Sequence, residues 1–376
     1  MLEIVFWAAV GLLVYAQVGY PLVLLALTRL VRGRTQPARA GAEALPSVTL
    51  IVAAHDEQRD IAAKVANALA LDYPRERLEL IVASDGSADA TVERARAAGA
   101  DDVLDLPRGG KVAAQNAAAE RARGELLVFS DANSAWRPDA LRLLVAAFED
   151  PRVGYAVGQV KLLADDGATS QEGAYWRYEM GIRALESGLG GVTSGNGAIY
   201  AVRREAYVRV DERMGHDLSL PFNMVKHGWR PVYVAGAQAD EKMIPSAEGE
   251  YRRKRRMASY GWLITVQGGM LSPRGYGLLY AFQIASHRVL RYLAPFLHVV
   301  ALAANVALLG EGLIYTLTLA LQGALLVAAA LGPFVPAKPL RIAYYYVLVT
   351  TSLVTGMWRW LRGGAVAWWD TPEEAR

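Results

Sequence analysis

Acidic side chains follow or close three short apolar runs in the first part of the sequence. The runs are VTLIVAA (48–54), LELIVAS (78–84) and ELLVFSD (125–131), and the polar residues at their ends are Asp56, Glu57, Asp85, Asp131 and Asn133. If the runs are neighbouring parallel strands, their carboxyl ends meet at one edge of a sheet. Converging carboxylates repel one another unless a cation or hydrogen-bond donors compensate. A hard divalent cation with a bound phosphate would do so, whereas each Asp taken alone could simply cap the next helix.

The segment GGKVAAQN (109–116) places two glycines and Lys111 at the predicted start of a helix. Backbone amides at a helix start attract phosphate and other anions. The segment is not a P-loop, because it lacks the GxxxxGK[ST] spacing. With Asp85 before it and Asp131 after it, the segment favours a nucleotide site over a set of independent helix caps.

Two further polar segments follow. TSGNG (193–197) is a glycine-rich loop before a strand, formed by Gly195, Asn196 and Gly197, and such a loop lets backbone approach a ligand closely. His216 and Asp217 then open an amphipathic helix. Asp217 is either the N-cap of that helix or a catalytic base that faces the cleft.

The segment EYRRKRRMASYGW (250–262) holds five consecutive basic residues between aromatic ones. A basic run of this kind is typical of a nucleic-acid or anionic-lipid patch, or of a solvated helix face. On a helix, Arg253 and Arg256 share a face with Tyr260. Arginine forks on that face would suit a diphosphate, whose charge grows as it leaves.

The elements that would position these residues alternate between strands and helices. Apolar runs at 48–54, 78–84, 102–106 and 125–131 are separated by amphipathic stretches near 57–70, 88–98, 111–122 and 138–148. Strands that are apolar throughout are buried on both faces, which is typical of a parallel sheet. The pattern predicts an α/β fold with a doubly wound, mostly parallel sheet. Further elements are expected up to residue 236, namely helices near 171–186 and 217–227 and strands near 198–203 and 231–235.

Composition indicates a soluble part and a membrane part in one chain of 376 residues, because 53% of them are hydrophobic although 40 are basic and 37 acidic. The net charge of +3 favours no particular partner. The chain has no cysteine, which excludes disulfides, thiolate metal sites and cysteine nucleophiles, and its five histidines show no zinc-site spacing.

Apolar stretches near both ends are long enough to cross a membrane. Residues 4–30 carry no charge before Arg29 and no cleavage signal follows, so a retained anchor is expected. The arginines that come next place the following domain in the cytoplasm by the positive-inside bias. Three more spans are expected at 292–310, 313–335 and 341–359, with 276–291 lying in the membrane interface.

Taken in order, AAHDEQ, SDGS, GGKVAAQN, SDAN, TSGNG, HD and RRKRR resemble the motifs of a family 2 glycosyltransferase of the membrane-bound, polysaccharide-synthase-like branch. The resemblance covers roughly residues 47–262. It implies a GT-A fold, which is a Rossmann-like α/β domain, flanked here by transmembrane and interfacial helices. It also implies inverting transfer of a sugar from a nucleoside diphosphate, usually UDP, with Mg²⁺ or Mn²⁺.

The resemblance assigns roles to the residues at the strand ends. Asp56, Glu57 and Asp85 would hold the nucleoside, and Lys111 the base or the diphosphate. Asp131 and Asn133 occupy the DxD motif, with Asn in place of its second Asp, and would bind the nucleotide sugar and the metal. Arg253 and Arg256 complete the set of residues expected to bind the nucleotide sugar.

The resemblance assigns the acceptor side to later residues. Asp217 stands where the family has the Asp of its ED motif, the general base, and His216 replaces the usual acidic neighbour. His216, the loop residues Gly195, Asn196 and Gly197, and Trp262 are expected on the acceptor side. Processive synthases carry QxxRW where this chain has RKRRM (253–257), so Arg256 keeps the arginine while Gln and Trp are lost. The departure favours an enzyme that adds one or a few sugars over a cellulose- or hyaluronan-synthase role.

The predicted organisation is a transmembrane helix (1–31), a linker (32–46), a cytoplasmic GT-A domain (47–249), basic and interfacial segments (250–291), and C-terminal transmembrane helices with a tail (292–376). The expected partners are a nucleoside-diphosphate sugar, a saccharide or lipid-linked acceptor and membrane lipids, and not nucleic acid.

Two other functions stay open at this point. One is a polyprenyl-phosphate glycosyltransferase that makes a lipid-linked sugar donor. The other is a nucleotide-sensing or transport subunit without catalysis, which the substitutions at Asn133, His216 and Met257 keep open. A glycoside hydrolase is a weaker alternative, because two carboxylates around a water leave the nucleotide-type strand ends unexplained.

Overall fold

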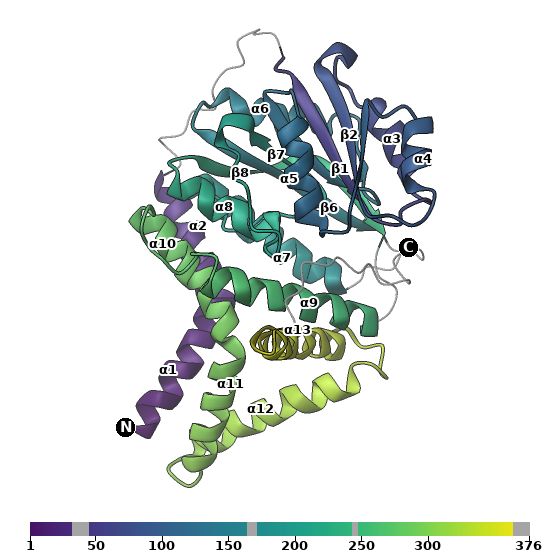
Figure 1. The fold of residues 1–376 in the computed structure, drawn as a ribbon. Coiled ribbons are helices and arrows are strands. Elements are labelled where there is room, and N and C mark those ends of the chain that lie inside the picture. The colour runs from purple at the N-terminus through teal and green to yellow at the C-terminus, as the bar shows by residue number, and fades with distance from the viewer. Residues whose placement is uncertain (32–44, 164–170, 243–246, 364–376) are drawn as a thin grey trace.

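An α/β domain stands on a group of apolar helices that project from one side of it (Figure 1). The computed structural model describes residues 1–31, 45–163, 171–242 and 247–363. The predicted linker therefore lies almost wholly outside the described residues, as do the final 13 residues of the tail, 364–376.

One sheet of eight strands forms the centre of the α/β domain. Its strands are β1 (Val48–Ala54), β2 (Leu78–Asp85), β3 (Asp102–Leu106), β4 (Leu126–Asp131), β5 (Ala135–Trp136), β6 (Val153–Leu163), β7 (Tyr200–Arg203) and β8 (Arg230–Lys242). They lie in the order β3-β2-β1-β4-β7-β6-β8-β5. The four strands predicted from apolar runs are confirmed, and they are parallel to one another.

The other half of the sheet is mixed. β7 is antiparallel to both β4 and β6, β6 is parallel to β8, and β5 pairs antiparallel with β8. Four of the seven strand pairings are parallel, so the prediction of a mostly parallel α/β sheet is confirmed, with the antiparallel pairings all in this second half. β6 was not predicted and β8 is longer than predicted, because both strands contain glycine and polar residues and lack a continuous apolar run.

Helices cover both faces of this sheet. They are α3 (Ile61–Leu69), α4 (Thr91–Ala97), α5 (Lys111–Arg121), α6 (Ala140–Ala146), α7 (Gln171–Leu189) and α8 (His216–Lys226), with single 3₁₀ turns η2 (Arg75–Arg77), η3 (Ala147–Glu149) and η4 (Arg204–Ala206). In β1, Leu50 and Val52 belong to the core with α3, α4 and α6, whereas Ile51 belongs to the core with α5 and α8. Burial on both faces explains why this strand is apolar at every position.

Three helices of the described residues are long and apolar enough to cross a membrane. The first joins α1 (Leu2–Val14), the π-helical segment η1 (Tyr15–Gly19) and α2 (Tyr20–Val31), and the second joins α10 (Leu278–Gln283), the π-helical segment η5 (Ile284–Val289) and α11 (Leu290–Ala307). The third is α12 (Leu313–Leu331). The segment 276–291, expected as a separate interfacial element, is thus mostly the beginning of a continuous helix.

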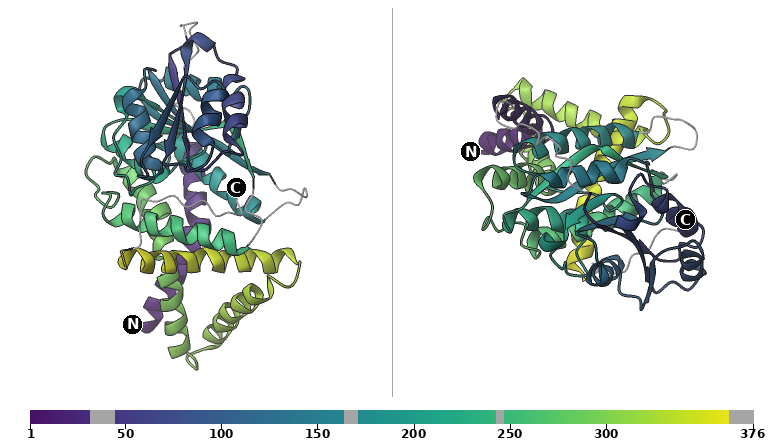
Figure 2. Two further views of the ribbon diagram at one scale, coloured as in Figure 1. Left: turned by 45° about the vertical axis from the view of Figure 1, so that its right-hand side comes forward. Right: turned by 90° about the horizontal axis from the view of Figure 1, so that it is seen from above.

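The span expected at 341–359 is not among them. This segment belongs to α13 (Lys338–Leu361), which crosses beneath the domain alongside α9 (Ala247–Val266), as Figure 2 shows. The residues at 343, 348, 352 and 356 of α13 are buried. Their spacing of four or five positions places them on one face of the helix. Gly356 allows the close approach, because an added Cβ would lie 2.5 Å from the Cβ of Ala258 on α9. One face of α13 therefore packs against protein, whereas Ile342, Val354, Trp358 and Leu361 are exposed.

Candidate active site

The predicted convergence of strand ends is confirmed. β1 lies between β2 and β4, and its Ala53 and Ala54 pair in register with Asp131 and Ser84. Asp85, Asp131 and the residues after β1 therefore share one edge of the sheet. Backbone amides and cationic side chains of the chain itself offset much of the repulsion between these carboxylates.

Asp85 is bound by the loop that leads into α5. The side chain is 2% exposed, and its Oδ1 accepts hydrogen bonds from the N–H groups of Gly109 (2.7 Å) and Gly110 (2.8 Å). Its Oδ2 lies 3.2 Å from Nη1 of Arg108. Gly110 has a φ of 96°, which favours glycine. The glycine amides that the sequence pointed to as an anion site thus bind a carboxylate of the same chain.

The chain after β1 ties the first two strands together. Asp56 has a φ of 51°, which is uncommon outside glycine, and its Oδ1 accepts a hydrogen bond from the N–H of Ala88 (2.8 Å). Glu57 is 5% exposed, and its N–H donates to Oγ1 of Thr91 (2.8 Å). Both residues lie at the same edge as Asp85, which is the place that the nucleoside role requires.

Lys111 and Asp131 form an ion pair at the centre of this edge. Lys111 is the first residue of α5, and Asp131 is the last residue of β4. The two side chains are 20% and 15% exposed, so the pair is accessible from the cleft side. Asn133 is exposed at the rim.

The loop 193–197 places its backbone against this ion pair. A Cβ added at Gly197 would lie 2.9 Å from Nζ of Lys111 and 3.3 Å from Oδ2 of Asp131. The side chain of Asn196 holds the turn, since its Nδ2 donates to the Gly158 carbonyl (2.9 Å) and its Oδ1 accepts from the N–H of Ile199 (2.9 Å). The backbone of this loop is therefore what a ligand would meet, while the Asn196 side chain is used by the scaffold.

Asp217 lies on the other side of the same loop. Helix α8 begins at His216 with Gly215 as its N-cap, so Asp217 is in the first turn and does not cap the helix. The N–H of Gly195 donates to the carbonyl of Asp217 at 2.6 Å. Burial raises the pKa of Asp217, Lys111 lowers it and Asp131 raises it. A carboxylate near a cation and a second carboxylate, with a raised pKa, has the properties of a general base.

His216 points away from the loop and into the protein core. It is 3% exposed and is surrounded by the rings of Phe129, Tyr200 and Tyr207 at centroid distances of 5.5, 6.1 and 5.9 Å. Its Nδ1 is hydrogen-bonded to Oη of Tyr200 at 2.8 Å. The structure thus does not bring the His216 side chain to the acceptor side; it anchors the start of α8, and with it Asp217.

Two charged residues near the ion pair were not singled out from the sequence. Glu241, near the end of β8, has its pKa raised by burial and by Asp131. Lys64 of α3 is 3% exposed, its Nζ donates to the Ser134 carbonyl (2.7 Å), and burial lowers its pKa to about 7. Neither residue belongs to a local motif, because only the fold brings β8 and α3 to the end of β4.

The basic segment lies on α9. Arg253 pairs with Glu250 at 2.8 Å and also lowers the pKa of Glu241, so it reaches toward the Asp131 corner. Arg256 lies one turn further along the same helix. Trp262 is packed between helices, with its Nε1 donating to the Leu353 carbonyl of α13 (3.0 Å), so its indole N–H is engaged in the helix contact.

Comparison with known proteins agrees with this fold. The family described as "Glycosyltransferase like family 2" matches residues 46–261. An N-acetylglucosaminyltransferase of Mesorhizobium japonicum is 29% identical over 57% of this chain and 55% of its own, and a beta-monoglucosyldiacylglycerol synthase of Synechocystis is 27% identical over 58% and 48%. The chain thus spans about half the length of these relatives. The mannosyltransferase PcManGT of Pyrobaculum calidifontis, solved with GDP-Man and Mn²⁺, has a TM-score of 0.75 over 96% of this chain and 99% of its own at 22% identity.

The sheet, with its acidic strand ends and the flanking apolar helices, is a GT-A fold attached to membrane-type helices. The chain belongs to glycosyltransferase family 2. The family and fold expected from the sequence motifs are therefore confirmed.

The buried position of His216 predicts a specific dependence of stability on pH. Burial lowers its pKa to about 3, so the folded state leaves it neutral at pH values where the unfolded chain, with an ordinary pKa of 6.5, takes up a proton. Stability is therefore lost as the pH falls below 6.5, by about 2 kcal/mol between pH 7 and pH 5. In a His216→Phe variant this contribution is absent, so its free energy of unfolding should fall by about 2 kcal/mol less than that of the unchanged protein between pH 7 and pH 5. Parallel pH profiles for the two proteins would contradict the burial of a neutral histidine.

Proposed function

We propose that the chain is a membrane-integral inverting glycosyltransferase that moves a sugar from a nucleoside-diphosphate sugar, with UDP as the nucleotide, to a saccharide or lipid-linked acceptor in cell-envelope glycan synthesis. The observation that carries the proposal is the loop 193–197, which touches Asp217 through Gly195 and the Lys111–Asp131 pair through Gly197. The backbone of this loop thus lies between the proposed base and the proposed diphosphate corner. The catalytic domain would face the cytoplasm.

The nucleotide half of the site is formed by residues at the strand ends. Oδ2 of Asp85 is buried and accepts no hydrogen bond from the described residues, and its only described neighbour of opposite charge is the Arg108 guanidinium at 3.2 Å, so it could accept a bond from a nucleoside N–H or hydroxyl. Lys111 and the arginines Arg253 and Arg256 would neutralise the diphosphate as its negative charge grows. Asp56 and Glu57 complete the nucleoside side of this edge.

The residues at the corner fit a divalent cation. No group of three or more His, Asp or Glu side chains within the described ranges could hold a metal by itself. Mg²⁺ is commonly bound by one or two carboxylates together with substrate phosphates, and Mn²⁺ accepts the same oxygen ligands. Asp131, accessible and close to the acidic Glu241, would supply the carboxylate, with Asn133 beside it. When bound, the ion would act as a Lewis acid toward the leaving diphosphate.

The transfer itself would depend on Asp217. The acceptor hydroxyl gives its proton to the Asp217 carboxylate while its oxygen forms a bond to the anomeric carbon. The bond from that carbon to the diphosphate oxygen breaks on the opposite face, so the configuration inverts. Burial raises the pKa of Asp217, which strengthens it as a proton acceptor, and Lys111 offsets part of that rise.

Two substitutions separate binding from transfer. Asp217→Asn should keep nucleotide binding and lower the transfer rate by about 10²–10⁴-fold, because it removes only the base. Asp131→Asn should abolish metal-dependent nucleotide binding. Both are measured with purified full-length protein, by thermal stabilisation with UDP and Mn²⁺ and by UDP release from a UDP-sugar. Near-normal turnover in Asp217→Asn would show that another group is the base.

A single methyl group at Gly197 tests the diphosphate corner. In Gly197→Ala the new Cβ would lie 2.9 Å from Nζ of Lys111, the end of a flexible side chain, so the ammonium should move away from Asp131 and UDP binding should weaken while the fold is retained. The matched control is Gly181→Ala on α7, where nothing lies within 4 Å of the added Cβ. Equal UDP affinity in both variants, measured by calorimetry, would place the nucleotide elsewhere.

A further inference from the structure

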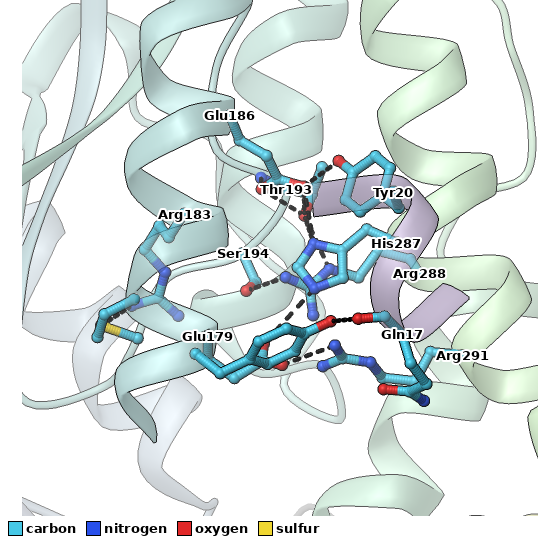
Figure 3. Close-up of polar contacts among 12 residues, drawn as sticks. Gln17, Tyr20, Glu179, Arg183, Glu186, Thr193, Ser194, His287, Arg288 and Arg291 are labelled. Carbon is cyan, nitrogen blue, oxygen red and sulfur yellow. Dashed lines mark hydrogen bonds and ion pairs between the residues drawn. The ribbon is translucent and has the colours of Figure 1, made fainter. Parts of the chain in front are cut away.

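A buried polar cluster lies between the loop 193–197 and the membrane helices (Figure 3). Helix α7 contributes Glu179, Arg183 and Glu186, whose spacing of four and three residues puts them on one face. The second membrane helix contributes His287, Arg288 and Arg291, and the first contributes Tyr20. The π-helical segment of the second helix holds His287 and Arg288, and that of the first ends next to Tyr20. Such segments often occur at functional sites.

Both carboxylates of the cluster have cationic partners. Glu186 is 0% exposed, accepts a hydrogen bond from Oη of Tyr20 (2.7 Å) and lies 2.7 Å from Nδ1 of His287. Glu179 lies 2.6 Å from Nη2 of Arg291. Burial acts to raise the pKa of each carboxyl, but the neighbouring cations outweigh it and lower both. These acids are therefore ionised and already have their counter-ions.

Two arginines of the cluster lack such a partner. Among the described residues, no carboxylate forms an ion pair with Arg183 or Arg288. Arg183 is 7% exposed, and its Nη2 donates to the carbonyl of Gly195 (2.9 Å). Arg288 donates from Nε to Oγ1 of Thr193 (2.9 Å) and from Nη2 to Oγ of Ser194 (2.6 Å). All of these acceptors are neutral, and burial, followed by the charge of Arg288, lowers the pKa of Arg183.

Arg183 is buried and Arg288 is half-buried, and the charge of Arg288 lowers the pKa of Arg183. Neither forms an ion pair with a carboxylate of the described residues, so an anion bound between them would offset the cost of their repulsion. The planar fork of arginine matches phosphate oxygens, and two forks match them better than one. The hydroxyls of Thr193 and Ser194 could turn to donate to the same anion. The cluster adjoins the two membrane helices, so an anion carried by a lipid could reach it from the membrane.

We propose that Arg183 and Arg288 form a binding site for the phosphate group of a lipid acceptor, held beneath the loop that contacts Asp217. The inference rests on the proposed glycosyltransferase function and narrows its acceptor to a phosphorylated membrane lipid. Arg291 and the two glutamates form the rigid frame that holds the two arginines in place.

The ligand class is tested with full-length protein in detergent micelles. The probes are a long-chain isoprenyl phosphate, the isoprenyl alcohol of the same length, and inorganic phosphate, each at equal concentration. The lipid phosphate should raise the Tm, and the other two should not. An equal shift with the alcohol would overturn the phosphate site, and an equal shift with inorganic phosphate would overturn the lipid assignment.

Matched variants test the two arginines. Arg183→Met and Arg288→Met should weaken binding of the lipid phosphate at least tenfold and, without lipid, should leave the Tm unchanged or higher, because no counter-ion is stranded. Arg291→Met is the control and should lower the Tm, because it leaves Glu179 buried without its arginine. The proposal is wrong if the first two variants lose Tm as Arg291→Met does, or if they bind the probe normally.

The outcome for this site can be separated from the outcome for the proposed function. Asp217→Asn should retain the shift with lipid phosphate and lose sugar transfer. A shift in a protein that transfers no sugar would support the phosphate site and contradict the glycosyltransferase. Sugar transfer to a neutral acceptor, with no Tm shift on adding lipid phosphate, would support the glycosyltransferase and contradict the phosphate site.

Discussion

The ion pair between Lys111 and Asp131 is the contact on which the candidate site depends. It joins the first residue of α5 to the last residue of β4, and Gly197 of the loop packs directly against it. The two members of the pair have opposite effects on the pKa of Asp217: Lys111 lowers it and Asp131 raises it. A ligand that takes the place of either partner would therefore change the charge that Asp217 experiences.

The scaffold around this pair is built from buried polar side chains in fixed positions. Asp85 is held by two glycine amides, Asn196 closes the turn of the loop, and His216 fixes the start of α8 through Tyr200. Each of these polar side chains is buried and hydrogen-bonded, which restricts the backbone to one arrangement. The result is a site in which few groups are free to move and the accessible charges lie at its centre.

The sequence predicted the parts that follow from local pattern. Apolar runs gave β1, β2 and β4, and the parallel arrangement then required Asp85 and Asp131 to share an edge. It did not predict Glu241 or Lys64 as neighbours of Asp131, because their proximity depends on how distant strands and helices pack. It expected a span at 341–359, whereas this segment belongs to α13, which is not among the three helices long and apolar enough to cross a membrane and which packs one face against protein.

The same limit applies to the polar cluster of α7 and the membrane helices. In the sequence, Arg288 and Arg291 suggested an interfacial segment, whereas in the fold they meet Glu179 and the loop 193–195. This contact connects the catalytic domain to the membrane helices through charged side chains. The connection is the basis for the proposed lipid acceptor, which would reach the site from the membrane.

The central claim is that this site transfers a sugar. The most direct measurement is a screen of nucleotide sugars with purified full-length protein, Mn²⁺ and a membrane lipid extract, recording nucleotide release and the mass of the product. The account predicts release of UDP from at least one UDP-sugar together with an acceptor heavier by one or a few sugar residues. Binding of UDP with no release from any nucleotide sugar, acceptor present, would contradict it.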